Sequence, residues 1–549
     1  VSDTLYGLFL EDINFAVDGG LYAELIKNRS FEYGSAAANE NKHGWTNEYP
    51  DYVTFAVIDG NQTGSPGYLN ENNPHYALLS YNGLSSADQY YGIGNVGYLD
   101  GLAVTSNEVY NVSLYLRTAS ESDITQIDAA SYASSTKPIP HADAALRLTL
   151  RDTDGVVYAQ DFIENISGSW TKYETTLTPA ETVNKNLRLY IECKDPGTAV
   201  CLDMVSMMPA DTYKGLPIRK DIGEYMEALN PSFLRFPGGC VIEGRDEESI
   251  YDWKDSIGNG LTFTVNGNET TGDAAARPQG KSIWSGTKND PYYTTYGIGF
   301  YEYFLLCEAL DCLPVPVLNA GMTCQVQSPR YIVYPLSSDE FKQYIQDALD
   351  LVEFCRGGAD TTWGAVRIGN EQWQSEYHAH YEKFAEAFEN AAKENPELYG
   401  DIELIVANGT ASVSTEGWSY IEDYPDSVTT LADEHYYESP NWFLTNTKRY
   451  DAYDRNTQAK VFLGEYAAQS NTLQAALSEA AYMTGLERNS DIVAMACYAP
   501  LFGNSKTNQW LPDMMFFSNN ALFGTADYYV QKMFANHVGK TILPSRLTL

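Results

Sequence analysis

Two glutamates that each follow a short apolar run have the clearest potential for chemistry. Glu371 ends the run AVRIGNE at 365–371, and Glu465 lies near the end of AKVFLGEYA at 459–467. Glycoside hydrolysis needs two carboxyl groups around one anomeric carbon, about 5 to 5.5 Å apart when one of them attacks directly. These glutamates are too distant in sequence for a local helix or hairpin to pair them. The alternative is that each glutamate only starts a helix, where its charge meets the helix dipole favourably.

Other polar residues also end apolar runs in this chain. In a (β/α)8 barrel the active site lies at the carboxyl ends of the strands, so these residues are predicted to converge there. His435 and Tyr437 are two positions apart and can therefore share one face of a strand. The collected residues are Glu11, Arg235, Asn319, Asn370, Glu371, Asn408, His435, Tyr437 and Glu465.

Short apolar runs alternate with segments of helical period over most of the chain, which predicts an α/β fold with a parallel sheet. Eight such runs, each followed by a helical segment, predict a closed (β/α)8 TIM barrel. Helices are expected at 337–358, where apolar residues recur at helical spacing before Gly-Gly, and at 19–28 (GGLYAELIKN) after the first run. The predicted strands are 4–13, 232–239, 313–321, 365–371, 402–409, 428–437, 459–467 and 492–500.

Residues 45–209 interrupt this alternation. They are rich in Gly, Asn and Ser and contain short alternating runs such as NVSLYLRTA and ALRLTLRD, which are typical of an all-β domain. We therefore expect a catalytic barrel formed by 1–44 and 210–538, with an inserted β-sandwich at 45–209. The final KTILPSRLTL reads as an orphan strand, so 539–549 is expected to begin a C-terminal β-sandwich.

The amino-acid composition limits which molecules this chain can bind. With 73 acidic and 35 basic residues the net charge is −38, which repels nucleic acid and anionic membrane surfaces and favours a neutral substrate. The apolar runs are too short to span a bilayer. The first residues show no signal peptide, which leaves the compartment open, with an extracellular location favoured over the cytoplasm. Among the eight cysteines, Cys193 and Cys201 are the best candidates for a disulfide, although two free thiols fit equally well.

Several longer motifs make the sequence resemble glycoside hydrolase family 51, the retaining α-L-arabinofuranosidases, in the branch with an inserted carbohydrate-binding-like module. The resemblance spans nearly the whole chain. It is carried by LYGLFLEDINFAVDGGLYAELIKNRSFE from residue 5, FLRFPGGCVIEG from 233, YDWKDSIG from 251, RIGNEQW from 367, DEHYY from 433 and GEYA from 464.

The resemblance implies roles for the strand-end residues. Glu371 would be the acid/base and Glu465 the nucleophile, so Glu371 should have a pKa raised toward neutrality. Asn370 would donate to the sugar 2-hydroxyl, with a helix cap as its alternative. His435 would line the site, while the hydroxyl of Tyr437 would hold the nucleophile.

Four further residues complete the predicted site. By resemblance Glu11 grips hydroxyls of the arabinose ring, where the alternative is a surface ion pair, and Trp284 walls the pocket, where the alternative is the core. Arg235 is expected beneath the two glutamates, holding them charged. Cys240 follows Pro-Gly-Gly where some family members carry an asparagine that contacts the sugar; it is expected to line the pocket without an assigned bond.

Two other patterns are interpreted as structural. His378 and His380 lack the carboxylates of a metalloprotease motif and are predicted to lie on a solvated helix face. Asp152-Thr-Asp154-Gly is predicted to form a hairpin turn, because the other ligand positions of a calcium loop are absent. No metal or cofactor is expected.

The sequence thus predicts a retaining exo-glycosidase that releases terminal α-L-arabinofuranosyl residues from arabinoxylan- or arabinan-type chains. A β-xylosidase or an endo-glucanase on the same barrel, and a catalytically silent polysaccharide-binding protein, remain as alternatives. The family's C-terminal β-sandwich is expected to be missing or truncated here. The oligomeric state stays open.

Overall fold

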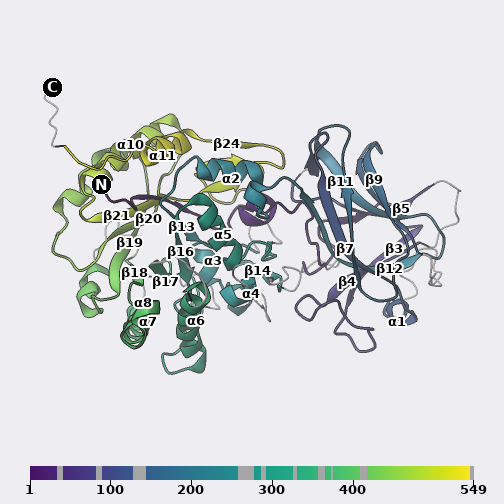
Figure 1. Ribbon diagram of the computed structural model, residues 1–549, viewed down its shortest axis with the longest axis horizontal. Coiled ribbons are helices and arrows are strands. Elements are labelled where there is room, and N and C mark those ends of the chain that lie inside the picture. The colour runs from purple at the N-terminus through teal and green to yellow at the C-terminus, as the bar shows by residue number, and fades with distance from the viewer. Residues whose placement is uncertain are drawn as a thin grey trace.

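The computed structural model describes eleven stretches of the chain. These are residues 1–33, 41–81, 89–99, 101–127, 144–257, 277–285, 292–324, 331–356, 365–372, 375–408 and 417–543. A barrel ringed by helices lies at one end of the long axis and a group of antiparallel strands at the other (Figure 1).

Eight parallel strands close into the barrel, and their order around it follows the sequence. Each strand falls within one residue of a run predicted from the sequence, so the predicted (β/α)8 TIM barrel is confirmed. The strands are β1 (Tyr6–Phe9), β13 (Phe233–Phe236), β16 (Leu313–Leu318), β17 (Ala365–Ile368), β18 (Glu403–Ala407), β19 (Thr429–Glu438), β20 (Lys460–Ala468) and β21 (Val493–Tyr498).

The barrel strands are apolar on both faces because both faces are covered. Phe9, Phe233 and Phe462 belong to a cluster inside the barrel, while Leu8 and Leu234 belong to the core between the strands and the helices. Alternate side chains of a strand point to opposite faces, so each run supplies both cores. The barrel strands are therefore unbroken apolar runs, without the alternation of apolar and polar residues seen in a strand with one exposed face.

Helices cover the outside of the barrel. The helix predicted at 337–358 forms as α6, and its buried residues include Phe341, Ala348 and Val352, which face the core. The helices are α2 (Lys220–Glu227), α3 (Cys240–Glu243), α4 (Trp253–Ile257), α5 (Phe300–Leu310), α6 (Asp339–Arg356), α7 (Ser375–Glu394), α8 (Pro396–Tyr399), α9 (Pro440–Thr445), α10 (Leu473–Arg488) and α11 (Ala526–Ala535), with α1 (Glu121–Thr125) among the antiparallel strands.

The helix predicted at 19–28 is wrong. Only a short π-helical turn, Val17–Leu21, forms there, and the chain then runs extended. The cause is Glu24, whose buried carboxylate accepts hydrogen bonds from the backbone N–H groups of Ile26 and Met207 and from the Ser206 hydroxyl. Bonds to residues so distant in sequence outweigh local helix propensity.

Between the first and second barrel strands the chain forms two antiparallel sheets. A five-stranded sheet has the order β10-β7-β12-β4-β3, and a six-stranded sheet has the order β2-β5-β11-β8-β9, with β6 beside β11. One hydrophobic cluster takes residues from both sheets, so they pack face to face. The strands are β2 (Trp45–Asn47), β3 (Val53–Asp59), β4 (His75–Tyr81), β5 (Tyr91–Asn95), β6 (Leu102–Val104), β7 (Tyr110–Thr118), β8 (Leu146–Asp152), β9 (Val157–Ile163), β10 (Thr171–Leu177), β11 (Val183–Cys193) and β12 (Ala199–Pro209).

Smaller strands complete the described structure. β14 (Gly280–Lys281) pairs with β15 (Tyr293–Thr294), and β22 (Phe502–Asn504), β23 (Met515–Phe517) and β24 (Leu522–Gly524) form a sheet. The strand expected at 539–549 is not seen in its described part, 539–543; the rest lies outside the described residues. No described helix has the length and apolar character needed to cross a membrane.

Three local predictions have clear outcomes. Cys193 and Cys201 are both buried free thiols, so they form no disulfide. The hairpin turn at Asp152 is confirmed, because its carboxylate accepts from the N–H groups of Asp154 and Val156 between β8 and β9. The prediction of a solvated face is wrong for His380, which is 3 % exposed and whose Nδ1 bonds the Ala320 carbonyl.

Candidate active site

After strand β17 the chain bends sharply at Gly369, and the next residues lie at the mouth of the barrel. Gly369 has φ +73°, a left-handed conformation that glycine adopts without strain, and an added Cβ would lie 2.8 Å from the ring of Tyr377. Asn370 and Glu371 follow at the carboxyl end of the strand, where barrel enzymes hold their catalytic groups. This geometry explains why an apolar strand ends in Gly-Asn-Glu.

Glu371 and Glu465 meet across the barrel mouth. One carboxylate oxygen of Glu371 lies within 4.8 Å of one of Glu465, and a ring nitrogen of His435 lies between them. His435 Nδ1 is 2.9 Å from Glu371 Oε1 and 3.6 Å from Glu465 Oε2. The structure therefore brings together the two glutamates that the sequence places far apart.

Both oxygens of Glu465 are held by donors. Arg235 Nη2 donates to Oε1 at 2.8 Å, and the Tyr437 hydroxyl donates to Oε2 at 2.8 Å. Arg235 is fully buried and Glu465 is 5 % exposed, so solvent screens this contact little. Such charge-assisted hydrogen bonds fix the orientation of the Glu465 carboxylate.

Glu371 has a different environment. Burial raises its pKa, but the hydrogen bond and charge of His435, together with Arg235 and Arg367, outweigh burial and leave the pKa below its ordinary value. The expectation of a raised pKa is thus wrong for the free site. The physical reason is His435, whose Nδ1 lies 2.9 Å from Glu371 Oε1 and whose Nε2 lies 3.1 Å from Asp433 Oδ2, so both ring nitrogens meet carboxylates.

Beneath the carboxylates lies a pair of buried arginines that share Asp433. Arg367 makes a close ion pair with Asp433 Oδ2, and Arg235 Nη1 is 3.7 Å from the same oxygen. Asp433 Oδ1 also accepts from the Gly464 N–H at 2.9 Å. Sequence reasoning missed Arg367 and Asp433 as support for the site. An arginine within the apolar run AVRI was the available signal, because a fully buried arginine needs a buried partner.

Asn370 is fixed by both its side chain and its backbone. Its Oδ1 accepts from Arg235 Nη2 at 2.6 Å, its N–H donates to Glu243 Oε1 at 2.8 Å, and its Nδ2 lies 3.7 Å from Cys240 Sγ. A Cβ added to Gly239 would come within 3.0 Å of Asn370 and Glu465. The second glycine of Pro-Gly-Gly therefore leaves room for this side chain.

Glu11 lies beside the same motif. Its Oε1 accepts from the N–H groups of Gly239 and Val241 at 3.2 and 3.1 Å. Burial and the nearby charge of Glu465 raise the pKa of Glu11 to about 8. Glu11 therefore carries a proton at neutral pH in the free site and can donate a hydrogen bond as well as accept one.

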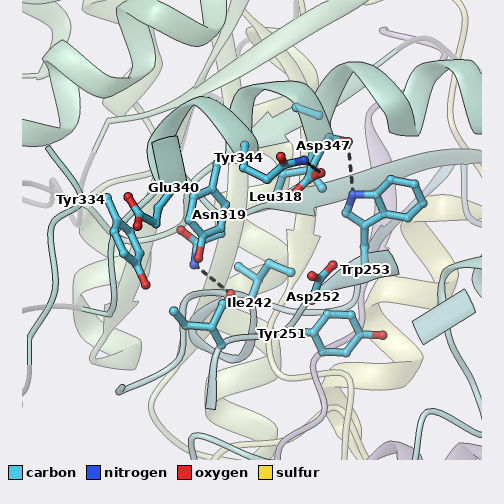
Figure 2. A pocket seen from close by; sticks show the side chains of 13 residues that line it. Ile242, Tyr251, Asp252, Trp253, Leu318, Asn319, Tyr334, Glu340, Tyr344 and Asp347 are labelled. Atoms are coloured by element: carbon cyan, nitrogen blue, oxygen red, sulfur yellow. Dashed lines mark hydrogen bonds between the residues drawn. The ribbon is translucent and has the colours of Figure 1, made fainter. Parts of the chain in front are cut away.

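Three other residues of the predicted site are Asn319, Asn408 and Trp284. The side chain of Asn319 bonds the Ile242 carbonyl and the Gly321 N–H, and it lines a neighbouring cavity of about 340 Å³ between α3, α4 and α6 (Figure 2). Asn408 is buried behind the site, and its N–H donates to the Asp433 carbonyl. Trp284 lies partly buried after β14, and its place in the sugar pocket stays a prediction.

Two groups of described residues could hold a cation, since each places three ligand atoms within 4.8 Å of one another. One is Glu371, His435 and Glu465; the other is Cys240, Glu243 and Cys324. Sequence reasoning missed Glu243, the last residue of α3, and Cys324, in the segment after β16.

Comparisons with known proteins agree with this geometry. Residues 225–455 match the family model "Alpha-L-arabinofuranosidase 1 domain", and 450–548 match "Alpha-L-arabinofuranosidase C-terminal domain". The expectation that the C-terminal region is missing is therefore wrong. That match begins before β20, so part of the region contributes strands to the barrel itself, which is why it does not read as a separate β domain.

Similar whole chains carry the same name. An extracellular exo-α-L-arabinofuranosidase of Streptomyces chartreusis is 36% identical over all of this chain, which spans 61% of that protein's length. α-L-Arabinofuranosidase 2 of Arabidopsis thaliana is 32% identical, again over all of this chain and 74% of its own length. A solved arabinose-bound GH51 α-L-arabinofuranosidase superposes with a TM-score of 0.80 at 27% identity, covering 100% of this chain and 82% of the other.

Proposed function

Because this chain belongs to glycoside hydrolase family 51, the α-L-arabinofuranosidases, we propose that it releases terminal α-L-arabinofuranosyl residues with retention of configuration. The observation that carries this proposal is the approach of Glu371 and Glu465 to within 4.8 Å between carboxylate oxygens. Inverting enzymes separate their carboxyl groups by about 6.5 to 9.5 Å to admit a water, whereas retaining enzymes hold them about 5 to 5.5 Å apart.

In the first step Glu465 attacks the anomeric carbon and Glu371 protonates the departing oxygen. The bond from the carbon to that oxygen breaks as the ester to Glu465 forms, and the aglycone leaves as an alcohol. Arg235 and Tyr437 support the assignment of Glu465 as the nucleophile, because their hydrogen bonds orient its carboxylate.

The proton for this step is proposed to come from the pair that Glu371 forms with His435. Burial raises the pKa of Glu371, but the hydrogen bond and charge of His435, 2.9 Å away, outweigh burial and leave that pKa below its ordinary value. When a glycosidic oxygen approaches Glu371, the proton can pass from Nδ1 through Oε1 to that oxygen. In the second step Glu371 takes a proton from the attacking water and returns it to His435, while Glu465 is released.

Substrate contacts are assigned to the remaining residues around the pair. Asn370, held by Arg235 and Glu243, is positioned to donate Nδ2 to the sugar 2-hydroxyl. Glu11 is proposed to bind further ring hydroxyls, and Trp284 and Cys240 to line the pocket. Arabinoxylan- or arabinan-type chains are the proposed natural substrates, and the name of the Streptomyces relative favours action outside the cell.

The two antiparallel sheets are proposed to form an inserted module with the architecture of a carbohydrate-binding domain but a structural role. Its contacts with the barrel support this role: Met207 bonds Glu24, the Asn519 side chain donates to the Gly101 carbonyl, and Asn73 donates to the Arg277 carbonyl. These bonds support the proposal that the module braces the barrel.

Hydrolysis of nitrophenyl α-L-arabinofuranoside tests the proposal. The intact protein is expected to turn over this substrate faster than the matching β-xyloside or β-cellobioside, and the Glu465→Ala variant is expected to lose the activity. Faster turnover of the xyloside or cellobioside would favour a β-xylosidase or an endo-glucanase. Inactivity of the correctly folded protein on all three would favour a polysaccharide-binding protein.

A further inference from the structure

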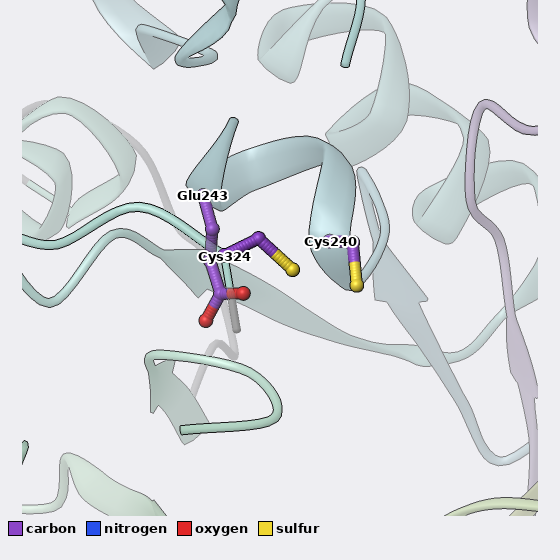
Figure 3. A group of neighbouring side chains, drawn as sticks. All are labelled: Cys240, Glu243 and Cys324. Carbon is purple, nitrogen blue, oxygen red and sulfur yellow. The ribbon is translucent and has the colours of Figure 1, made fainter. Parts of the chain in front are cut away.

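Cys240, Glu243 and Cys324 form a compact group directly behind the candidate active site. Cys240 and Glu243 stand at the two ends of α3, three positions apart and so on one side of the helix, and Cys324 reaches them from the segment after β16 (Figure 3). One ligand atom from each of the three lies within 4.8 Å of the other two. None of these side chains is used in the proposed hydrolysis as a reacting group.

The group is held in place by its surroundings. The Cys324 N–H donates to the Gly244 carbonyl at 2.8 Å, which joins its segment to the end of α3. Gln372 Nε2 donates both to Glu243 Oε1 at 2.7 Å and to the Thr323 carbonyl at 3.2 Å. Supporting bonds of this kind orient metal ligands and raise affinity, since less ordering is needed on binding.

The carboxylate of Glu243 has several partners. Oε1 accepts from both Asn370 N–H and Gln372 Nε2, and the carboxylate also hydrogen-bonds the thiol of Cys324. Glu243 is fully buried and lies beside Cys324. A buried carboxylate beside two thiols offers one oxygen and two sulfur ligands to a cation, which would take the place of the thiol protons that now lie between them.

We propose that Cys240 Sγ, Cys324 Sγ and Glu243 Oε2 form a binding site for a thiophilic divalent cation of the Zn²⁺ type. Zinc accepts sulfur at about 2.3 Å and carboxylate oxygen at about 2.0 to 2.2 Å in tetrahedral geometry, which places ligand atoms about 3.5 to 3.8 Å apart. Ligand atoms that lie within 4.8 Å of one another therefore need to close by no more than about 1.3 Å. Calcium and magnesium are disfavoured, because they prefer oxygen ligands alone.

Binding is coupled to the loss of protons. The hydrogen bond with Cys324 and burial raise the pKa of the Cys240 thiol well above its ordinary value. The hydrogen bond with Cys240 lowers the pKa of Cys324, but burial and Glu243 raise it overall to about 12. The cation must displace both thiol protons, which pass to solvent, so its affinity rises with pH.

The site would support a residue of the reaction. Glu243 receives the backbone N–H of Asn370, and Cys240 Sγ lies 3.7 Å from the Asn370 side chain. A cation that fixes Cys240 and Glu243 therefore fixes the turn that presents Asn370 and Glu371. It is a positioning site, because none of its ligands touches the anomeric carbon in the proposed mechanism.

A cobalt titration of the reduced, full chain tests the site without reference to turnover. Co²⁺ bound to thiolate gives a near-ultraviolet charge-transfer band that carboxylate and imidazole ligands do not give, so ions at Glu371, His435 and Glu465 would not contribute. The expected result is a band that saturates at one Co²⁺ per chain and is displaced by Zn²⁺. The band should disappear in Cys324→Ser. In Glu243→Gln the apparent affinity for Co²⁺, read from the titration of the band, should fall at least about tenfold.

Cys312→Ser is the matched control. Cys312 interacts with Cys307 and immediately precedes β16, at the opposite end of the strand from the site, so this variant should keep the full band. Zn²⁺ should also raise the thermal unfolding midpoint of the intact protein and of Cys312→Ser, but not of Cys324→Ser. No band in the intact protein, a full band in Cys324→Ser, or equal loss in Cys312→Ser would overturn the proposal.

Discussion

Glu465 in the barrel and Glu192 in the six-stranded sheet are both buried glutamates held by arginine, yet only one is suited to chemistry. Glu192 is 1 % exposed; Arg147 donates twice to its Oε2, the Thr149 hydroxyl donates to the same oxygen, and Arg151 Nη2 lies 3.3 Å from Oε1. Arg151 Nη2 also lies 3.9 Å from Glu48 Oε2, but among the described residues no carboxylate bonds Glu192 itself. Glu465 has arginine and tyrosine donors as well, but it also has Glu371 within 4.8 Å.

The aromatic rings near Glu192 sharpen the contrast. The guanidinium groups of Arg147 and Arg151 lie 3.8 Å from the ring centroids of Tyr90 and Tyr190. A ring face covered by a guanidinium cannot also stack on a sugar. The difference teaches that a buried glutamate–arginine contact indicates stability in the sheets, and that a shared space with a second carboxylate is what indicates catalysis in the barrel.

Replacing Glu465 in the barrel and Glu192 in the six-stranded sheet should give the largest difference between the two regions. Glu465→Ala should lower kcat/KM by about 10⁴-fold or more, because the nucleophile is lost. Glu192→Gln should leave kcat/KM unchanged but lower the free energy of unfolding by about 1.5 to 3 kcal/mol, since hydrogen bonds to a charged group are lost. Steady-state kinetics and denaturant unfolding measure both. An inactive, fully stable Glu192→Gln would break the comparison.

Replacing Glu371 should have a smaller effect that depends on the leaving group. Glu371→Ala removes the proton donor and should lower kcat by about 10²- to 10⁴-fold on a natural oligosaccharide. Nitrophenolate needs little protonation, so formation of the glycosyl-enzyme should be less affected and added azide should restore turnover. Equal losses on both substrates, without rescue by azide, would contradict the acid/base assignment.

Tyr437→Phe should weaken the site without removing any reacting group. Loss of the 2.8 Å hydrogen bond to Glu465 Oε2 should lower kcat/KM by about 10- to 100-fold, equivalent to about 1.5 to 3 kcal/mol. The Tyr190→Phe variant is the control, because that hydroxyl bonds Glu48 in the sheets. Equal effects of the two changes on kcat/KM would show that the barrel tyrosine has no special role.

The smallest effect concerns stability and pH. The pKa of Glu11 is about 8 in the folded chain and 4.5 ordinarily, so between these values the folded chain holds more protons than the unfolded chain. The stability that protonated Glu11 contributes to the folded chain is therefore fully present below pH 4.5 and is lost as the pH rises to about 8. Glu11→Gln should give a shallower fall of the unfolding midpoint over that window. An unchanged slope would contradict the raised pKa.

Much of the barrel could be predicted from the sequence, because each strand is a short apolar run ending in polar residues. That ground and the family resemblance predict Glu371, Glu465, Arg235 and Tyr437 together. In the structure Arg235 and Tyr437 bond Glu465, and a carboxylate oxygen of Glu371 lies within 4.8 Å of one of Glu465. Strand-end position is a local property, so it can be read without coordinates.

What the sequence did not reveal depends on contacts between distant segments. The helix expected at 19–28 fails because Glu24 bonds Met207, and the lowered pKa of Glu371 arises from His435 on another strand. Glu243 and Cys324 join only after α3 packs against the segment following β16. No periodicity marks such pairs, since each member looks ordinary in its own segment.

The anomeric configuration of the first sugar released tests the central claim most directly. Time-resolved proton NMR of nitrophenyl α-L-arabinofuranoside hydrolysis distinguishes the two anomers before they interconvert in water. With carboxylate oxygens within 4.8 Å of each other, the account predicts that α-L-arabinofuranose forms first, by two displacements at one carbon. Initial release of the β-anomer would show that water attacks directly and would contradict Glu465 as the nucleophile.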